Sequence, residues 1–281
     1  MQFRTDLAME AAADAAVGGK EWTEGDVSLF RLTADAATAA RLGKPEGVYL
    51  TATLPPLTDD EQALEQQAKV IGAQLQALLP PDGTVLVVGL GNEAITPDAL
   101  GPLTAARVLA TRHIPDELAR SVGLTELRPC AVMTPGVLGN TGVESGEMVA
   151  GVCRTVRPSA VIAVDALAAR SLARLGCTVQ LSDTGIAPGS GVGNNRRALC
   201  RSTLGIPVIG LGVPTVVDAQ TVAQDLTGAA SDAVAPRGCA MMVTPREIDL
   251  MVDRAARLLA MAIHAALQPA YSPLELSAIA R

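Results

Sequence analysis

Short apolar runs alternate with helical segments along most of the chain, and this alternation constrains the fold more than any other feature. Five runs predict strands, and the first, third and fifth of them are apolar at nearly every position, as strands buried on both faces are. They are VLVVGLG (85–91), LRPCAVMT (127–134), AVIAVDAL (160–167), TVQLSD (178–183) and PVIGLGV (207–213). Helices are expected near 97–111, 144–156 and 218–229, with a short one at SLARL (171–175). The alternation predicts an α/β fold, a mostly parallel sheet with helices on both faces.

The flanking segments complete this prediction. Residues 26–56 carry two strand-like stretches and predict a small N-terminal β region. Two capping boxes, at 58–61 and 244–247, predict the starts of two amphipathic helices, the second of them long. No linker is large enough to separate a second domain, so residues 7–281 are expected to form one α/β domain after a short segment, 1–6.

The core must be aliphatic, because hydrophobic residues make up 49% of the chain and aromatic residues only 2%. A net charge of −7 disfavours binding to nucleic acid or to an anionic membrane. Five cysteines without CxxC spacing indicate reduced thiols, and no apolar run approaches the roughly 20 residues that cross a bilayer. We therefore expect a cytoplasmic protein.

The turn Gly89-Leu90-Gly91 after the first strand fits the loose pattern of a dinucleotide-binding turn. The next helix is expected to begin at Thr96-Pro97, too late to aim its dipole at the glycines. Asp98 would repel a pyrophosphate at this position, and the acid expected at the end of the next strand is absent. Nucleotide binding remains a minor alternative.

Acidic residues stand where strands end, and this is where α/β folds build their clefts. Asp165 ends an otherwise apolar strand, and Asp183 and Asp218 occupy comparable places. If strands 85–91 and 160–165 are neighbours, Asp98 and Asp165 approach one another, share a proton and split their apparent pKa values. The ionised acid then activates a water while the protonated one donates to a carbonyl oxygen, which is amide hydrolysis without a metal.

Metal chemistry is the competing interpretation. The chain has two histidines, His113 and His264, in no HExxH spacing, and both are expected to be structural. A magnesium or calcium site built from carboxylates alone stays open, although no cation-loop pattern supports it.

Strings in order along nearly the whole chain resemble one known family. They are RTDLAMEAA (4–12), VVGLGNEAITPDALGP (87–102), TRHI (111–114), PGVLGNTGVE (135–144), VIAVDALAARS (161–171), SDTGIAPGSGVGNNRR (182–197), TLGIPVIGLGVPTVVDA (203–219) and MVTPREIDLM (242–251). The family is the germination protease, or spore protease, of spore-forming bacteria.

This resemblance implies an aspartic-type endopeptidase that degrades small acid-soluble spore proteins during germination. It implies a tetrameric enzyme of the spore core, made as a zymogen, without a cofactor, on a fold similar to the hydrogenase-maturation endopeptidases. The family's two proposed catalytic aspartates fall on Asp98 in TPDALGP and Asp165 in AVDALAARS. A metallopeptidase on the same fold, with these aspartates as ligands, is the alternative.

The family's substrates are cut after an acid and before an apolar residue followed by Ala. Thr5-Asp6-Leu7-Ala8-Met9-Glu10 is similar to that site, which predicts self-cleavage between Asp6 and Leu7. A cut after an acid favours a positive pocket, for which the candidates are Arg196, Arg197 and Arg170. Gly191, whose flexible backbone allows a peptide to approach closely, and Asp183 complete the predicted substrate-binding set.

The chain departs from the family pattern in two places. Six residues precede the predicted cut, where relatives carry a longer pro-segment, and the stretch between Asp218 and Met242 is short. Inhibition of the zymogen is therefore expected to be weak or to work differently.

Overall fold

The computed structural model describes residues 5–59, 63–121, 123–187, 197–228, 234 and 241–280. In these residues nine strands form one sheet in the order β1-β2-β3-β7-β8-β6-β4-β5, with β9 paired to β8. The strands are β1 (Lys20–Glu24), β2 (Val27–Ala34), β3 (Gly47–Thr53), β4 (Val85–Gly89), β5 (Cys130–Met133), β6 (Ala160–Ala169), β7 (Thr178–Ser182), β8 (Val208–Asp218) and β9 (Met242–Val243).

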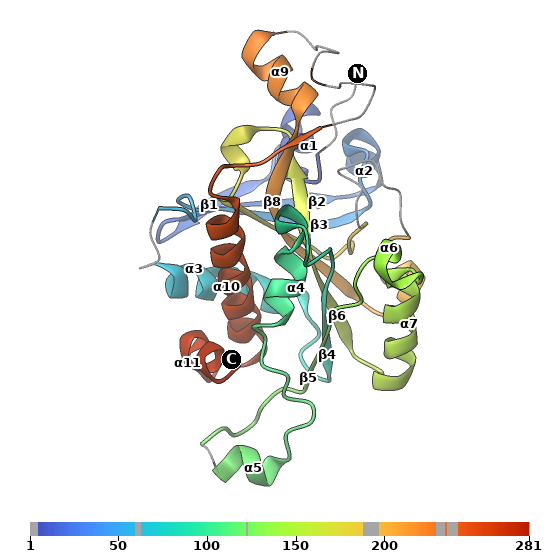
Figure 1. Cartoon of the computed structure of the whole chain (residues 1–281), viewed down its shortest axis with the longest axis vertical. Coiled ribbons are helices and arrows are strands. Elements are labelled where there is room, and N and C mark those ends of the chain that lie inside the picture. The colour runs from blue at the N-terminus through green and yellow to red at the C-terminus, as the bar shows by residue number, and fades with distance from the viewer. Residues whose placement is uncertain are drawn as a thin grey trace.

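Helices connect the strands and cover the sheet (Figure 1). The α-helices are α1 (Ala8–Asp14), α2 (Ala36–Leu42), α3 (Leu64–Leu78), α4 (Leu100–Ala105), α5 (Asp116–Ser121), α6 (Leu138–Thr141), α7 (Ser145–Val156), α8 (Arg201–Leu204), α9 (Ala219–Thr227), α10 (Ile248–Leu267) and α11 (Pro273–Ile279). Two 3₁₀ turns, η1 (Thr96–Asp98) and η2 (Leu172–Arg174), lie beside them.

The predicted α/β class is confirmed, and its parallel part is the four strands β5, β4, β6 and β8. The strand β7 runs antiparallel to β8, and β3, β2 and β1 continue the sheet antiparallel from there. The expected N-terminal β region is therefore an extension of the same sheet. A long crossover is unnecessary between antiparallel strands, which is why no long helix separates β1, β2 and β3.

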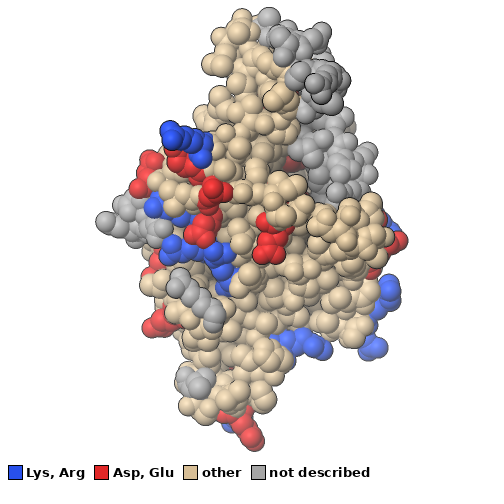
Figure 2. Space-filling model, viewed as in Figure 1, with Lys and Arg blue, Asp and Glu red and all other residues tan. Residues whose placement is uncertain are grey.

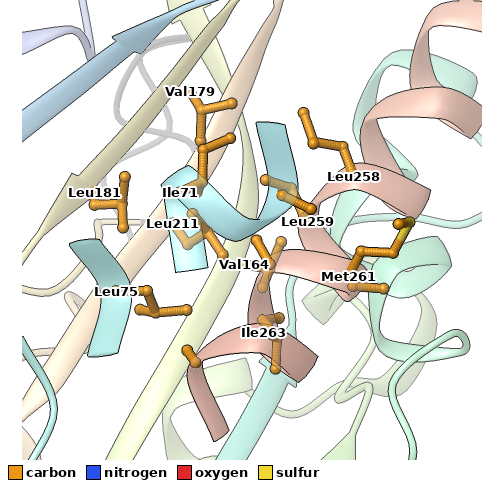
Figure 3. Close-up of a cluster of buried hydrophobic side chains, with 14 of the residues drawn as sticks. Ile71, Leu75, Val164, Val179, Leu181, Leu211, Leu258, Leu259, Met261 and Ile263 are labelled. Carbon is orange, nitrogen blue, oxygen red and sulfur yellow. The ribbon is translucent and has the colours of Figure 1, made fainter. Parts of the chain in front are cut away.

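Alternating strand residues divide into two apolar layers. On one face Val87 and Val164 pack with α3 and α10, and Figure 3 shows Ile71, Leu258 and other aliphatic side chains meeting there. On the other face Val88 and neighbouring strand residues pack against α7. Burial of each such side chain stabilises the fold by about 1.5–3 kcal/mol, so aliphatic residues suffice for this core.

Neither α3 nor α10 begins at its predicted capping box, and residues 60 and 61 of the first box lie outside the described residues. The helix α3 begins at Leu64 after Ala63, with no side-chain cap, and the Thr58 hydroxyl instead donates to Asp59. The helix α10 likewise begins at Ile248 without a side-chain cap. The Thr244 hydroxyl donates to the Thr215 carbonyl of β8, so a tertiary contact takes the group that the local pattern assigned to the helix.

The helix expected near 97–111 is interrupted. Its first residues form η1, and α4 then ends at Ala105. The helices α1, α2 and α11 and the strand β1 were not anticipated, because each is short.

Charge is distributed without an extended basic area on the face seen in Figure 2, where acidic and basic side chains are interspersed. In the described part of the chain, no helix combines the length and the hydropathy that crossing a membrane requires.

His264 is structural, as expected. It lies on α10 with 2% of its surface exposed, and its Nε2 accepts a hydrogen bond from the Leu109 amide at 2.9 Å. Nδ1 lies 3.2 Å from the Ser277 hydroxyl of α11. Burial lowers the pKa of the imidazole from 6.5 to about 4, against a smaller opposing effect of the Pro273 backbone.

This shift predicts acid sensitivity of the fold. Below pH 6.5 His264 binds a proton in the unfolded chain, whereas in the folded protein it stays neutral until about pH 4. The free energy of unfolding therefore decreases as the pH falls from 6.5 to about 4. The free energy of unfolding of wild type should exceed that of His264→Gln by about 3 kcal/mol less at pH 4 than at pH 6.5. Urea unfolding at the two pH values measures this difference. His113→Gln, a change at an exposed site, is the control. A constant difference between wild type and His264→Gln would contradict the assignment.

Candidate active site

A wide cleft of about 1320 Å³ opens beyond the carboxyl ends of the parallel strands. Asp98 and Asp165 both line it. The strands that precede them, β4 and β6, are adjacent and parallel, with Gly89 opposite Val164, so the expected adjacency is confirmed. Topology thus brings the two predicted acids to one cavity from segments more than sixty positions apart in the sequence.

Asp98 is fixed by the turn that folds back after β4. Its amide donates to the Ile95 carbonyl at 2.8 Å, and its Oδ2 accepts from the Asn92 amide at 2.7 Å. The Thr215 hydroxyl of β8 holds the neighbouring Pro97 carbonyl at 2.7 Å. A carboxylate therefore already occupies the amide that follows Gly91, which removes the support for a phosphate-binding turn there.

Glycines are required where this turn meets the sheet. Gly91 has φ +116, and a Cβ there would lie 2.0 Å from the Asp98 carbonyl oxygen. Gly101 at the start of α4 lies so close to the strands that its Cβ would be 2.1 Å from the Leu90 oxygen and 2.5 Å from the Val164 oxygen. The close approach of α4 sets the position of Asp98 relative to β6.

Asp165 lies on β6 and is only 5% exposed. Its Oδ1 accepts from the Ala166 amide at 2.9 Å. Across the sheet, Asp165 stands opposite Gly212 of β8, which stands opposite Gln180 of β7. Gly212 has no side chain, and a Cβ there would lie 2.8 Å from Leu167 Cγ. The Leu167 side chain therefore covers Gly212 between the acid and Gln180.

The N-terminal segment of the chain lies in this cleft, to whose lining Thr5 and Asp6 belong. The Asp6 amide donates to the Ala168 carbonyl at 2.9 Å, and the Ala168 amide donates to Asp6 Oδ2 at 2.8 Å. Leu7 follows with extended backbone angles, φ −77 and ψ 120. Thr5-Asp6-Leu7 is therefore held along β6, three residues after Asp165.

The residues after Leu7 are also held by specific contacts. Leu7 is fully buried against Leu167, Ala169 and Val217. Ala8, which begins α1, is fully buried as well.

The Glu10 carboxylate accepts from the Arg170 amide at 2.8 Å and from the Ser171 amide at 2.9 Å. It also accepts from the Thr5 hydroxyl, so both ends of the motif meet at one carboxylate.

Two polar side chains that were not predicted hold the carbonyl of Asp6. Gln180 Nε2 donates to it at 2.8 Å and Lys44 Nζ at 3.0 Å. Gln180 Oε1 accepts from the Ala8 amide, so this one side chain binds the main chain on both sides of the Asp6–Leu7 bond. The only sequence signal for Gln180 was an amide side chain within the strand-like run TVQLS, and no signal indicated Lys44.

The other predicted substrate residues lie in different places. The Arg170 guanidinium forms an ion pair with Asp14 of α1. Asp183 Oδ1 accepts from the Val48 amide at 2.7 Å and does not line the cleft. Arg197 is exposed and lies outside the lining as well.

Arg196 and Gly191 fall outside the described residues. The substrate-binding roles of all five residues stay predictions.

Cysteine and metal chemistry receive little support from the side chains that are described. Cys200 lines the cleft, but neither histidine does, so no Cys–His pair forms there. Within the described ranges no group of three or more His, Cys, Asp and Glu side chains is arranged to hold a metal ion.

An α/β fold, two acids in one cleft and an extended peptide segment held across that cleft define the class as a peptidase. Comparison with known proteins gives the family: the one described as Germination protease matches residues 4–229. This chain therefore belongs to the germination protease family, and it is an endopeptidase of a spore protease family.

Three relatives named Germination protease match over two thirds or more of their length. That of Caldanaerobacter subterraneus subsp. tengcongensis is 37% identical over 98% of this chain and 97% of its own. That of Clostridium perfringens (strain ATCC 13124) is 36% identical over 95% of this chain and 95% of its own. That of Clostridium acetobutylicum is 41% identical over 70% of this chain and 68% of its own.

Among solved structures, the [NiFe] hydrogenase maturation protease HycI from Thermococcus kodakarensis KOD1 matches 68% of this chain and 98% of its own. Its identity is 16% and its TM-score 0.38.

The packing of Gly101 gives a testable consequence. Gly101→Ala should lower the free energy of unfolding by about 1–3 kcal/mol, because the new methyl meets backbone atoms of both strands. It should also reduce peptidase activity by shifting Asp98. Gly139→Ala in α6, where no atom lies within 4 Å of the added Cβ, should be neutral or stabilising. Equal effects in urea unfolding would show that the close approach of α4 is unimportant.

Proposed function

We propose that this protein is a self-processing, aspartic-type endopeptidase that degrades small acid-soluble spore proteins in the spore core during germination. It cuts after an acidic residue and before an apolar residue followed by Ala. By family resemblance it acts as a homotetramer, is made as a zymogen and uses no cofactor. The observation that carries the proposal is the docking of Thr5-Asp6-Leu7 in the cleft that Asp98 and Asp165 line.

The pair of acids supplies the chemistry. Two carboxyl groups that lie close together ionise in turn, so in this proposal one is a carboxylate while the other keeps its proton. The carboxylate removes a proton from a water that attacks the peptide carbonyl, and the acid returns a proton to the reacting groups. Asp165, nearly buried on β6, and Asp98, more exposed on η1, have different surroundings that favour such a division.

The docked segment also accounts for the sequence preference. The Ala168 amide binds the carboxylate before the bond, and the apolar pocket around Leu167 takes the side chain after it. Ala8 is fully buried, so a larger residue there has no room. The Arg170 and Ser171 amides bind the final Glu of the motif. A small acid-soluble spore protein with the same pattern makes the same contacts in this proposal.

The mechanism predicts that each aspartate is needed on its own. Asp98→Asn and Asp165→Asn should each lower kcat/KM on a peptide of residues 1–16 by about 10²–10⁴-fold, because acid–base catalysis is lost. Asp35→Asn, at the N-cap of α2, should retain full activity because Asn caps equally well. Retained cleavage in either active-site variant rejects the paired-acid mechanism.

The metallopeptidase alternative is tested on the same assay. Exhaustive chelation should leave kcat/KM unchanged if the two aspartates act alone. Loss of activity on chelation and its return on adding a divalent metal would establish the alternative instead.

Self-processing is predicted between Asp6 and Leu7. Intact-mass analysis of the active protein should find Leu7 as the first residue. Asp6→Ala should slow this cut about 10–100-fold, since the charge-assisted bond to the Ala168 amide is lost. Asp14→Ala, which removes only the exposed ion pair with Arg170, should change the rate less than about fivefold. An active enzyme that keeps residue 4 would disprove the cut.

A further inference from the structure

We propose that Lys44 and Gln180 form the oxyanion site of this peptidase. They stabilise the negative charge that develops on the carbonyl oxygen of the residue before the cut. The assignment rests on the proposed function, because it takes the Asp6–Leu7 bond as the internal substrate. It adds Lys44 and Gln180, which no sequence motif indicated, to the catalytic residues of the proposed mechanism.

The contacts have the geometry that such a site needs. Gln180 Nε2 lies 2.8 Å and Lys44 Nζ 3.0 Å from the Asp6 oxygen. Preorganised donors about 2.7–3.1 Å from a developing oxyanion are the usual arrangement in acyl-transfer enzymes. Two donors satisfy both lone pairs of the carbonyl oxygen, so the protonated aspartate is left to serve the leaving nitrogen.

The sheet register places Gln180 and the predicted acid on the same face. Asp165, Gly212 and Gln180 are successive partners across β6, β8 and β7, and partners in a row point to the same side of a sheet. Two strand spacings, roughly 10 Å, separate the outer two. Gly212 stands between them without a side chain, and the Leu167 side chain lies over it, with Cγ 2.8 Å from the position that a Cβ would take.

Gln180 also sets the register of the peptide. Its Oε1 accepts from the Ala8 amide while its Nε2 donates to the Asp6 carbonyl. In an extended peptide the carbonyl of one residue and the amide two residues later point to the same side. The Gln180 side chain therefore makes the two hydrogen bonds that a neighbouring strand would make, and it holds the Asp6–Leu7 bond between them.

Lys44 brings positive charge to the same oxygen from the loop after α2. Its side chain is partly buried and also contacts the Thr5 carbonyl at 3.2 Å. Burial lowers the pKa of its ammonium, while the nearby Asp6 and Glu10 carboxylates raise it. A cation held at a partly dry site acts more strongly on an oxyanion than one in water.

In the step itself, one aspartate takes a proton from water as the water oxygen bonds to the Asp6 carbonyl carbon. The carbonyl π electrons move onto the oxygen, where Lys44 and Gln180 stabilise them. When the double bond re-forms, the bond from carbon to the Leu7 nitrogen breaks. That nitrogen takes a proton from the acidic aspartate, and the products are a carboxyl group on Asp6 and an amine on Leu7.

The test uses the full chain with Lys44→Met and Gln180→Glu. The second change is isosteric and keeps an acceptor for the Ala8 amide, but replaces the Nε2 donor with an oxygen. Each should lower kcat on the 1–16 peptide by about 10²–10³-fold, and KM should rise by a smaller factor, because both side chains also bind the uncleaved carbonyl. The rate of self-cleavage after refolding from urea should fall to the same extent. Lys69→Met and Gln76→Glu, both on α3, are matched controls expected to keep wild-type kcat.

The outcomes are distinguishable. A fall in kcat that exceeds the rise in KM, with unfolding in urea like wild type, supports the oxyanion site. A raised KM with unchanged kcat means that the two side chains only bind the ground state, which overturns it. Wild-type kcat in either variant, while Asp98→Asn and Asp165→Asn are inactive, rejects this inference alone. If wild-type protein cuts neither itself nor the peptide, the proposed function fails first.

Discussion

The contact between α4 and the strands β4 and β6 is the constraint on which the cleft depends. Gly101 lies against the Leu90 and Val164 carbonyl oxygens, and the Leu90 amide donates to the Val164 carbonyl at 2.8 Å. Any side chain at Gly101 would lift α4 from the sheet and move the turn before it. Because Asp98 lies in that turn, the distance between the two acids follows from a packing contact that involves neither carboxylate.

One strand then serves two purposes. β6 supplies Asp165 and, three residues later, the amide and carbonyl of Ala168 that hold Asp6. The register shift between Leu167 and Ala168 lies between these points and redirects the strand where the peptide docks. Because acid and docking groups belong to one rigid element, the register of the peptide relative to Asp165 is fixed by covalent geometry and not by loop conformation.

The sequence was informative where local pattern and burial coincide. Continuous apolar runs located the parallel strands, and an acid ending such a run identified Asp165. It failed where distant partners decide. Thr244 bonds to β8 instead of capping α10, and α1 is short and held by contacts with other elements. Lys44 lies in the loop before β3 and Gln180 lies on β7, so only the pairing of β3 with β7 and of β7 with β8 brings them to the cleft. No local spacing encodes that pairing.

The docked segment raises the question of how other substrates enter. The proposed cleavage after Asp6 would release Thr5 and Asp6 but leave Leu7, Ala8 and Glu10 bound to the protein. The cut, however, places a new ammonium on Leu7, a residue with no exposed surface, and removes the Thr5 oxygen that its amide contacts at 3.1 Å. An α-amino group is largely charged at neutral pH, and a charge without a partner is costly in an apolar site. The proposed cut would therefore weaken the binding of α1 by itself and favour departure of this segment from the cleft.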